Sequence, residues 1–314
     1  MIDILEQELV ELSEEVFEIL LKDRTTENNI CWGTELYMEV GGEFYPQEPI
    51  TKALVTGKNT NVIKPRIAKA LEEQTKRTKD KAEVFTPSWV CNEQNNLIDE
   101  AWFGKKNVFN IANNQTWEAT KERITFPKNK DWTKYVDERR LEITCGEAPY
   151  LVSRYDTVTG KEIPIEQRIG LLDRKLRIVN ENTVSEEDWY KWVKRAYEST
   201  YGYEYQGDSL LIARENLLYT FIEYMEHRFS HIPTEIQLKE IAKIISWNLW
   251  QMDGITMTVP YSERPKNNQQ LTIFDIFDEV ELSDTEQIPC KIKDWRARKT
   301  IEFKSMINGG VKYG

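Results

Sequence analysis

The stretch RLEITCGEAPYL, residues 140–151, decides how the fold is interpreted. Its short apolar part, LEIT (141–144), predicts a strand that runs into a glycine-containing turn. Gly146 has no side chain beyond hydrogen, so it would let the backbone of this turn approach a ligand closely. The stretch therefore predicts a strand whose carboxyl end carries a ligand-binding turn.

Short apolar strands alternate with long amphipathic helices from residue 141 onward. TYGYEY (200–205) predicts a second strand, and the helices on either side of it begin with capping residues. Ser185 followed by Asp188 resembles a capping box, and Asp208 is the expected N-cap of the next helix. The helices are expected at 185–198, 208–229 and 234–250. This alternation favours a parallel sheet covered on both faces.

The remaining segments are less regular. Residues 1–23 have apolar side chains at helical spacing (Leu5, Leu9, Leu12, Val16, Ile19 and Leu20), which predicts a docking helix. We expect short strands and loops at 24–65, a polar helix at 66–81, an irregular insertion at 108–140, a polar loop at 262–287 and a β-hairpin at 290–304. The expected organisation is a helical and mixed extension at 1–81, followed by one α/β domain at 82–314.

The composition limits the classes of function. Among 314 residues, acidic side chains exceed basic ones by 11, so we do not expect this chain alone to be the main DNA-contacting surface. An acidic surface also suits a protein partner. The four cysteines lie far apart, which favours a reduced cytoplasmic protein without a disulfide framework or zinc ribbon. No apolar run of 18 residues occurs, and the acidic N-terminus is unlike a signal peptide, so no membrane span is expected.

Four segments, taken in chain order, carry a family pattern. They are AEVFTPSWVCNEQ (82–94), RLEITCGEAPYL (140–151), YGYEYQGDSLLIAREN (201–216) and WNLWQMDGITMTVP (247–260). Together with SRYDTVTGKEIP (153–164) and RIGLLDRKLRIV (168–179), they resemble the N-terminal, cofactor-binding part of adenine-specific DNA methyltransferase subunits of bacterial restriction–modification systems. The resemblance spans roughly residues 28–305.

This resemblance implies a Rossmann-like S-adenosylmethionine-dependent methyltransferase core with an incomplete parallel sheet. In such a core, Phe85 would pack beside the methionine part of the cofactor, and Glu142 or Glu147 would meet its amino group. Glu204 would accept hydrogen bonds from the ribose hydroxyls, and Asp253 from the adenine amine. The residues implied to surround the cofactor are Phe85, Thr86, Pro87, Glu142, Cys145, Gly146, Glu147, Glu204, Tyr205, Asp253 and Gly254.

Each motif also has a plain structural interpretation. The segment around Thr86 and Pro87 is also an ordinary extended turn before a helix, and Glu204 is also an acidic residue exposed at a strand end. Asp253 with Gly254 also forms a simple Asp-Gly turn. The turn after LEIT departs from the family, which usually has more glycines there, and Pro149 stiffens it. We interpret Cys145 as a packing residue rather than a nucleophile.

The catalytic motif of this family does not occur in the chain. The family uses an Asn, Asp or Ser followed by Pro-Pro and Tyr or Phe, which holds the flipped adenine and its amine. No Pro-Pro is present, and we reject the nearest strings, EAPY (147–150) and TVPY (258–261). The catalytic residues are therefore not assigned, and the chain is expected to be inactive alone. Without the motif-bearing strand, the strand at 141–144 becomes an open apolar edge, which a second chain, a copy of this chain or a local element should cover.

Two hypotheses follow. In the first, the chain is the S-adenosylmethionine-binding part of a DNA adenine methyltransferase that works with a second half and meets DNA through the assembled complex. In the second, it is an inactive methyltransferase-derived interaction protein that binds or inhibits a restriction or defence complex. The acidic balance and the missing motif favour the second hypothesis, and the four ordered motifs favour the first.

Other chemistries have weaker support. Pro289-Cys290 resembles the Pro-Cys of cytosine C5 methyltransferases, but no matching Glu-Asn-Val occurs. His227 and His231 are four residues apart and are expected to be solvated, so no metal site is expected. The sequence also has no Walker A loop, no HExxH and no nuclease pattern of spaced carboxylates.

Overall fold

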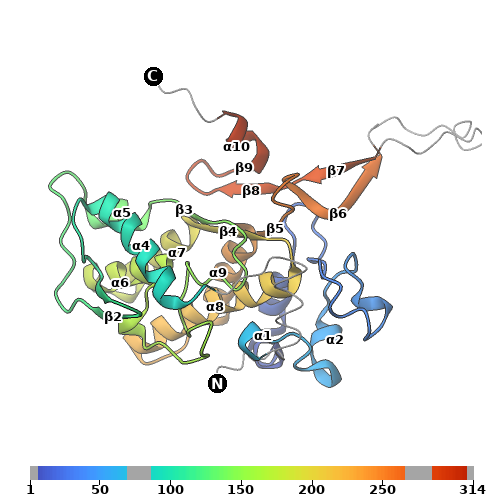
Figure 1. Cartoon of the computed structure of the whole chain (residues 1–314), viewed down its shortest axis with the longest axis horizontal. Coiled ribbons are helices and arrows are strands. Elements are labelled where there is room, and N and C mark those ends of the chain that lie inside the picture. Colours follow the sequence, from blue (N-terminus) through green and yellow to red (C-terminus); the bar gives the residue numbers. More distant parts are fainter. Residues whose placement is uncertain (1–5, 69–85, 266–284, 310–314) are drawn as a thin grey trace, which may run out of the picture.

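A three-stranded parallel sheet lies at the centre of the fold (Figure 1). The structure is a computed structural model that describes residues 6–68, 86–265 and 285–309. The strands run in the order β3 (Arg140–Glu142), β4 (Thr200–Glu204) and β5 (Leu249–Gln251). Leu141 pairs with Tyr201, and Tyr203 pairs with Trp250. The strands expected from LEIT and TYGYEY are both present, and their pairing is parallel as expected.

Two α-helices, α6 and α7, connect β3 to β4, and two, α8 and α9, connect β4 to β5. Ser185 caps α7 by accepting a hydrogen bond from the Asp188 N–H at 3.2 Å, which confirms the expected cap. Asp208 was expected to cap α8, but α8 begins one residue earlier and its N-cap is Gln206. The Gly207 N–H already donates to the Trp32 carbonyl, and Asp208 accepts from the Tyr37 hydroxyl instead. The helices are α6 (Leu171–Asn182), α7 (Glu186–Glu198), α8 (Gly207–Phe229) and α9 (Glu235–Asn248).

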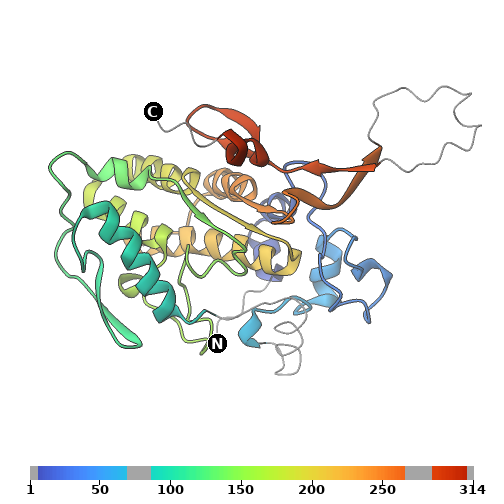
Figure 2. The same cartoon turned by 45° about the horizontal axis from the view of Figure 1, so that its top comes forward.

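The sheet is covered differently on its two faces. Figures 1 and 2 show the helices on one side of it and the C-terminal elements on the other. The expected hairpin at 290–304 is present, and it is followed by a short helix whose Phe303 packs against Trp250 with ring centroids 5.2 Å apart. These elements are β8 (Lys291–Asp294), β9 (Lys299–Glu302) and α10 (Phe303–Gly309). The second cover is therefore a hairpin with a short helix rather than a layer of long helices.

The N-terminal helix α1 (Glu6–Leu21) docks as expected. It packs on α9, and the Ser13 hydroxyl donates to the Glu235 carboxylate at 3.0 Å. The helix is kinked at Ser13, and Leu12, which we expected on the buried face, is exposed.

The segment after α1 lacks the strands that we expected at 24–65. It forms isolated β-bridges, such as the one between Cys31 and Pro49, and short helical turns. These turns are η1 (Gly42–Phe44), α2 (Lys52–Val55), η2 (Gly57–Asn59) and η3 (Arg66–Ala68). Of the polar helix expected at 66–81, only residues 66–68 lie within the described residues.

Two segments that we expected to be irregular contain antiparallel strand pairs. Residues 108–140 contain β1 and β2, and the described parts of 262–287 belong to β6 and β7. Most of these strand residues are polar and partly exposed, so they lack the apolar alternation that marks a half-buried strand. The elements are β1 (Asn110–Asn113), β2 (Thr116–Ala119), β6 (Thr258–Pro265) and β7 (Thr285–Pro289), together with α4 (Ser88–Phe103), α5 (Trp132–Val136) and η4 (Ile165–Gln167).

The largest hydrophobic core joins the N-terminal segment to the sheet and its helices. It contains Leu9 and Phe17 from α1, Trp32 from the following segment, and Leu217 and Leu249 from the α/β part. Among the described residues, we find no helix that is both long and apolar enough to span a membrane.

Candidate functional site

The turn after β3 is held in an unusual backbone conformation. Thr144, Gly146 and Ala148 all have positive φ, at 46°, 52° and 63°. The Cys145 N–H donates to the Tyr203 carbonyl at 2.8 Å, which fixes the turn above β4. A Cβ atom on Gly146 would meet no heavy atom of the described residues within 4 Å, so these residues leave open space beside this glycine.

Glu142 lies beneath this turn rather than at its surface. Its carboxylate accepts from the Tyr150 and Leu151 N–H groups at 3.3 and 3.2 Å. Burial raises the pKa of Glu142 well above its usual value, while the two backbone hydrogen bonds oppose that shift. The side chain therefore holds the loop closed over the end of β3.

Glu204 connects the ends of β3 and β4. Its carboxylate accepts from the Gly146 N–H at 2.9 Å, and from the Tyr205 and Gln206 N–H groups at 2.8 and 3.1 Å. The side chain is only 8% exposed. A carboxylate has about four acceptor positions, so these backbone donors occupy most of its capacity.

Asp253 and Gly254 lie just beyond the end of β5 and form a tight turn. One Asp253 oxygen accepts from the Ile255 and Thr256 N–H groups at 2.8 and 3.1 Å. A Cβ atom on Gly254 would lie 3.3 Å from the Tyr203 ring, so this turn lies close to β4. The pKa of Tyr205 is raised mainly by burial and by its hydrogen bond to Tyr261. The negative charge of Asp253 makes a smaller contribution in the same direction.

The segment before α4 contacts the loop that follows β3. The Thr86 carbonyl accepts from the Thr157 hydroxyl at 2.9 Å, and the Thr86 side chain hydrogen-bonds Tyr150. Pro87 directly precedes the first residue of α4 and is half-buried. Phe85, the aromatic residue of this motif, lies outside the described residues.

Cys145 and Glu147 point into the protein. The Cys145 sulfur is buried and would lie 3.3 Å from a Cβ atom on Gly202 of β4. Burial raises the pKa of the Cys145 thiol well above its usual value, and the charges of Glu142 and Glu204 raise it further, so it is not a thiolate nucleophile. Glu147 accepts from the Tyr155 hydroxyl at 2.8 Å.

The structure thus brings most of the candidate residues to one edge of the sheet. Parallel strands end on the same side, so the turns after β3, β4 and β5 are neighbours, and the segment before α4 lies against the first of them. Gly146, Glu204, Tyr205 and Asp253 lie at this edge, whereas Glu142 and Cys145 lie beneath it.

A segment near the N-terminus also lies at this edge, and the sequence motifs did not reveal it. The Cys31 N–H and carbonyl both bond the Gln251 side chain at 2.9 Å, and the Gln251 amide also donates to the Tyr205 carbonyl. Gly33, with φ at 64°, approaches so closely that a Cβ atom would lie 2.6 Å from the Tyr205 carbonyl oxygen. Within the part of the chain that the structure describes, the buried Thr34 hydroxyl has no hydrogen-bond partner. A lone Trp-Gly pair in one sequence gives no signal for this contact.

The alternative chemistries find no support. Burial raises the pKa of the Cys290 thiol, which donates to the Gln251 carbonyl at 3.4 Å, so this cysteine is not prepared to attack a base. The two histidines bond different carboxylates, Glu166 and Glu186. No group of three or more potential metal-ligating residues occurs among the residues that the structure describes.

No family model, curated protein or solved structure matches the chain.

Proposed function

We propose that this chain is the S-adenosylmethionine-binding part of a DNA adenine methyltransferase of a restriction–modification system. The supporting observation is the gathering of the Gly146 turn, Glu204 and Asp253 at the carboxyl ends of three neighbouring parallel strands. Ligands of open α/β sheets bind in this position. The proposal places the adenine-binding Pro-Pro motif outside these 314 residues, and DNA contact in the complex with the second half.

The residues at this edge fit the proposed cofactor. The open space beside Gly146 and its positive φ suit a ligand that lies against the backbone. Glu204 would accept hydrogen bonds from the ribose hydroxyls in exchange for some of its backbone donors, and the second Asp253 oxygen would accept one from the adenine amine. When bound, S-adenosylmethionine supplies the methyl group that passes directly to the adenine amine. Within this chain, Glu142 holds the turn that positions these groups.

Calorimetric titration of the purified chain with S-adenosylmethionine tests the proposal. We expect one site per chain, with an affinity at least about tenfold weaker in Glu204→Ala or Asp253→Ala, the effect of losing about 1.4 kcal/mol of binding free energy. Glu187→Ala, which removes an exposed carboxylate on α7, is the matched control and should bind as the unaltered chain does. Circular dichroism checks that each variant is folded. A folded chain that gives no binding heat, with no competition by S-adenosylhomocysteine, excludes the proposal.

A second candidate function is that of a non-catalytic interaction protein that inhibits a restriction or defence complex. It is favoured by the structural use of three implied cofactor residues, since both oxygens of Glu142 and of Glu204 and one Asp253 oxygen already hold backbone N–H groups. This candidate predicts a folded chain that does not bind S-adenosylmethionine but raises the plating efficiency of phage on a restricting host. Binding of the cofactor together with unchanged plating would exclude it.

A further inference from the structure

The outer edge of β3 is exposed and apolar. Among the described residues, β3 pairs with β4 on one side and with no strand on the other. Leu141 is 44% exposed, and Ile143, just beyond the strand, is 64% exposed. An open apolar edge of this kind is a template for pairing with another strand.

The backbone of β3 is oriented for such pairing. The Arg140 N–H points toward β4, where it donates to the Ser199 carbonyl at 3.0 Å. Successive residues of a strand point their backbone groups in opposite directions, so the N–H and carbonyl of Leu141 point away from the sheet. An added strand would hydrogen-bond these two groups.

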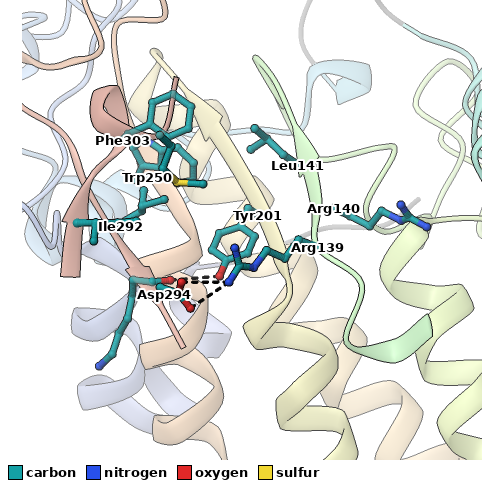
Figure 3. Close-up of a pocket in the computed structure, with 11 residues that line it drawn as sticks. Arg139, Arg140, Leu141, Tyr201, Trp250, Ile292, Asp294 and Phe303 are labelled. Atoms are coloured by element: carbon teal, nitrogen blue, oxygen red, sulfur yellow. Dashed lines mark hydrogen bonds and ion pairs between the residues drawn. The ribbon is translucent and has the colours of Figure 1, made fainter. Parts of the chain in front are cut away.

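A pocket lies beside this edge, on the sheet face that carries the C-terminal hairpin. It has a volume of about 120 Å³. Figure 3 shows Leu141 and Tyr201 on one side of it and Trp250, Ile292 and Phe303 on the other. Its lining is almost entirely apolar, so it would accept side chains of a strand that lies along β3.

The rim of the pocket has the opposite charge to the chain as a whole. The charged side chains at its rim are Arg139, Lys293 and Asp294, a net positive set in a chain with net charge −11, whereas the Arg140 guanidinium points away from the pocket (Figure 3). Arg139 bonds Asp294 at 3.0 Å, and the Lys293 ammonium lies over the Trp295 ring, 4.5 Å from its centroid. The rim therefore complements acidic groups on whatever binds there.

A second copy of this chain would fit poorly. Two copies that paired through such a short strand would bring two basic rims within a Debye length of about 8–10 Å, and each chain also carries the same large net negative charge. The charges favour a different protein over self-association.

We propose that the β3 edge and its pocket bind an extended segment of a partner protein, which adds a strand with apolar side chains over the pocket and acidic residues beside Arg139 and Lys293. The identity of this partner as the second half of the methyltransferase rests on the proposed function, whereas the surface itself does not. This mode of recognition combines backbone hydrogen bonds with side-chain pockets.

A synthetic peptide serves as the probe. It has about eight alternating valine and threonine residues, the length of an ordinary strand, with glutamates at both ends and a fluorescent label. Fluorescence anisotropy with the full chain should show binding that weakens as salt increases. A peptide with lysines in place of the glutamates should bind at least about tenfold more weakly. A central proline, which cannot donate to the strand pairing, should abolish binding.

Two variants locate the binding surface. Ile143→Glu should weaken the binding of the acidic peptide at least about tenfold, whereas Ile236→Glu, at an equally exposed isoleucine on α9, should not change it. Equal binding of the acidic and lysine peptides, or equal loss in both variants, overturns the proposal. So does a dimer in sedimentation equilibrium that Ile143→Glu dissociates and the peptide does not.

The outcome is independent of the cofactor. If the peptide binds at Ile143 and S-adenosylmethionine does not bind the chain, the proposed function fails and the strand-binding surface stands. If the cofactor binds and the peptide does not, only the strand-binding surface fails.

Discussion

Glu215 is a buried carboxyl group in the middle of α8 that has no hydrogen bond to either oxygen. Burial raises its pKa well above the usual value, the charge of Glu6 on α1 adds to this shift, and Arg154 opposes it. Glu215 is therefore protonated in the folded protein at pH values where it is ionised in the unfolded chain. This difference makes the free energy of unfolding depend on pH.

The pH dependence has a definite sign. Because the folded pKa is the raised one, the folded state binds the extra proton, and the stability falls as the pH rises above the unfolded pKa of about 4.3, by up to about 1.4 kcal/mol per pH unit. Glu215→Gln keeps the shape of the side chain and removes its titration. We expect the variant to match the unaltered chain at pH 4 and to become more stable than it as the pH rises above the unfolded pKa, in urea unfolding. Glu226→Gln, an exposed change on the same helix, should show no such trend.

Single residues were predictable in position more often than in role. Glu204 is the last residue of β4, and Asp253 lies two residues after β5. Their positions were predictable because the apolar strands before them are recognisable in the sequence. Their hydrogen bonds were not predictable, because they join backbone groups from turns that are distant in sequence, such as Gly146 and Glu204. The roles of these residues toward a cofactor stay predictions.

At the level of elements, the contact between the segment 30–34 and the start of α8 is unusually close. A Cβ atom on Gly207 would lie 1.9 Å from the Cys31 carbonyl oxygen, and the Gly207 N–H donates to the Trp32 carbonyl at 2.9 Å. Gly207→Ala must therefore push two backbone segments apart, which costs about 1–3 kcal/mol or more. We expect a lower midpoint in urea unfolding with nearly unchanged helical circular dichroism.

The control for this variant is Gly42→Ala. A Cβ atom there would meet nothing within 4 Å, and this glycine does not have a positive φ. Its unfolding midpoint should stay within experimental error of the unaltered chain. If Gly207→Ala is as stable as the Gly42→Ala control, the two segments can separate without loss of folding free energy, and the close contact between Gly207 and Cys31 does not stabilise the fold.

Elements with an apolar periodicity were predictable, and polar elements were not. Strands β3 and β4 and helices α7 and α8 follow the expected positions because burial imposes a pattern on their sequences. The helix expected at 234–250 ends at Asn248, and its last two residues belong to β5 instead, because a short buried apolar run suits a strand as well as a helix. Strands β1 and β2 are short and mostly exposed, and their pairing comes from backbone hydrogen bonds and the turn at Asn114, with φ at 52°. Such strands leave no hydrophobic signal in the sequence.

At the scale of the whole molecule, the N-terminal segment and the α/β part share one core. The expected boundary at residue 81 stays a prediction, but the contacts cross it. Arg214 of α8 is fully buried, and its guanidinium donates to the carbonyls of Leu20 and Lys22 on one side and of Ser246 and Leu249 on the other. Burial lowers the pKa of Arg214 to about 9, which still leaves it charged near neutral pH.

This arrangement predicts that the full chain unfolds in one cooperative transition. Separation of the two parts would expose α1 and α9 to water and leave the charged Arg214 without half of its carbonyl partners, so neither part gains by unfolding first. Scanning calorimetry at neutral pH should give a single peak whose calorimetric and van't Hoff enthalpies agree.

Arg214→Lys tests the same arrangement. Lysine cannot reach carbonyls on both sides at once, because its charge lies on a single nitrogen rather than on a planar fork. We expect this variant to lose about 3 kcal/mol of stability while its single peak moves as a whole to lower temperature. Arg123→Lys, at an exposed position, should leave the peak where it is. Two separate peaks in the unaltered chain would mean that the N-terminal segment folds independently, and Arg214 would then be a local contact of α8 alone.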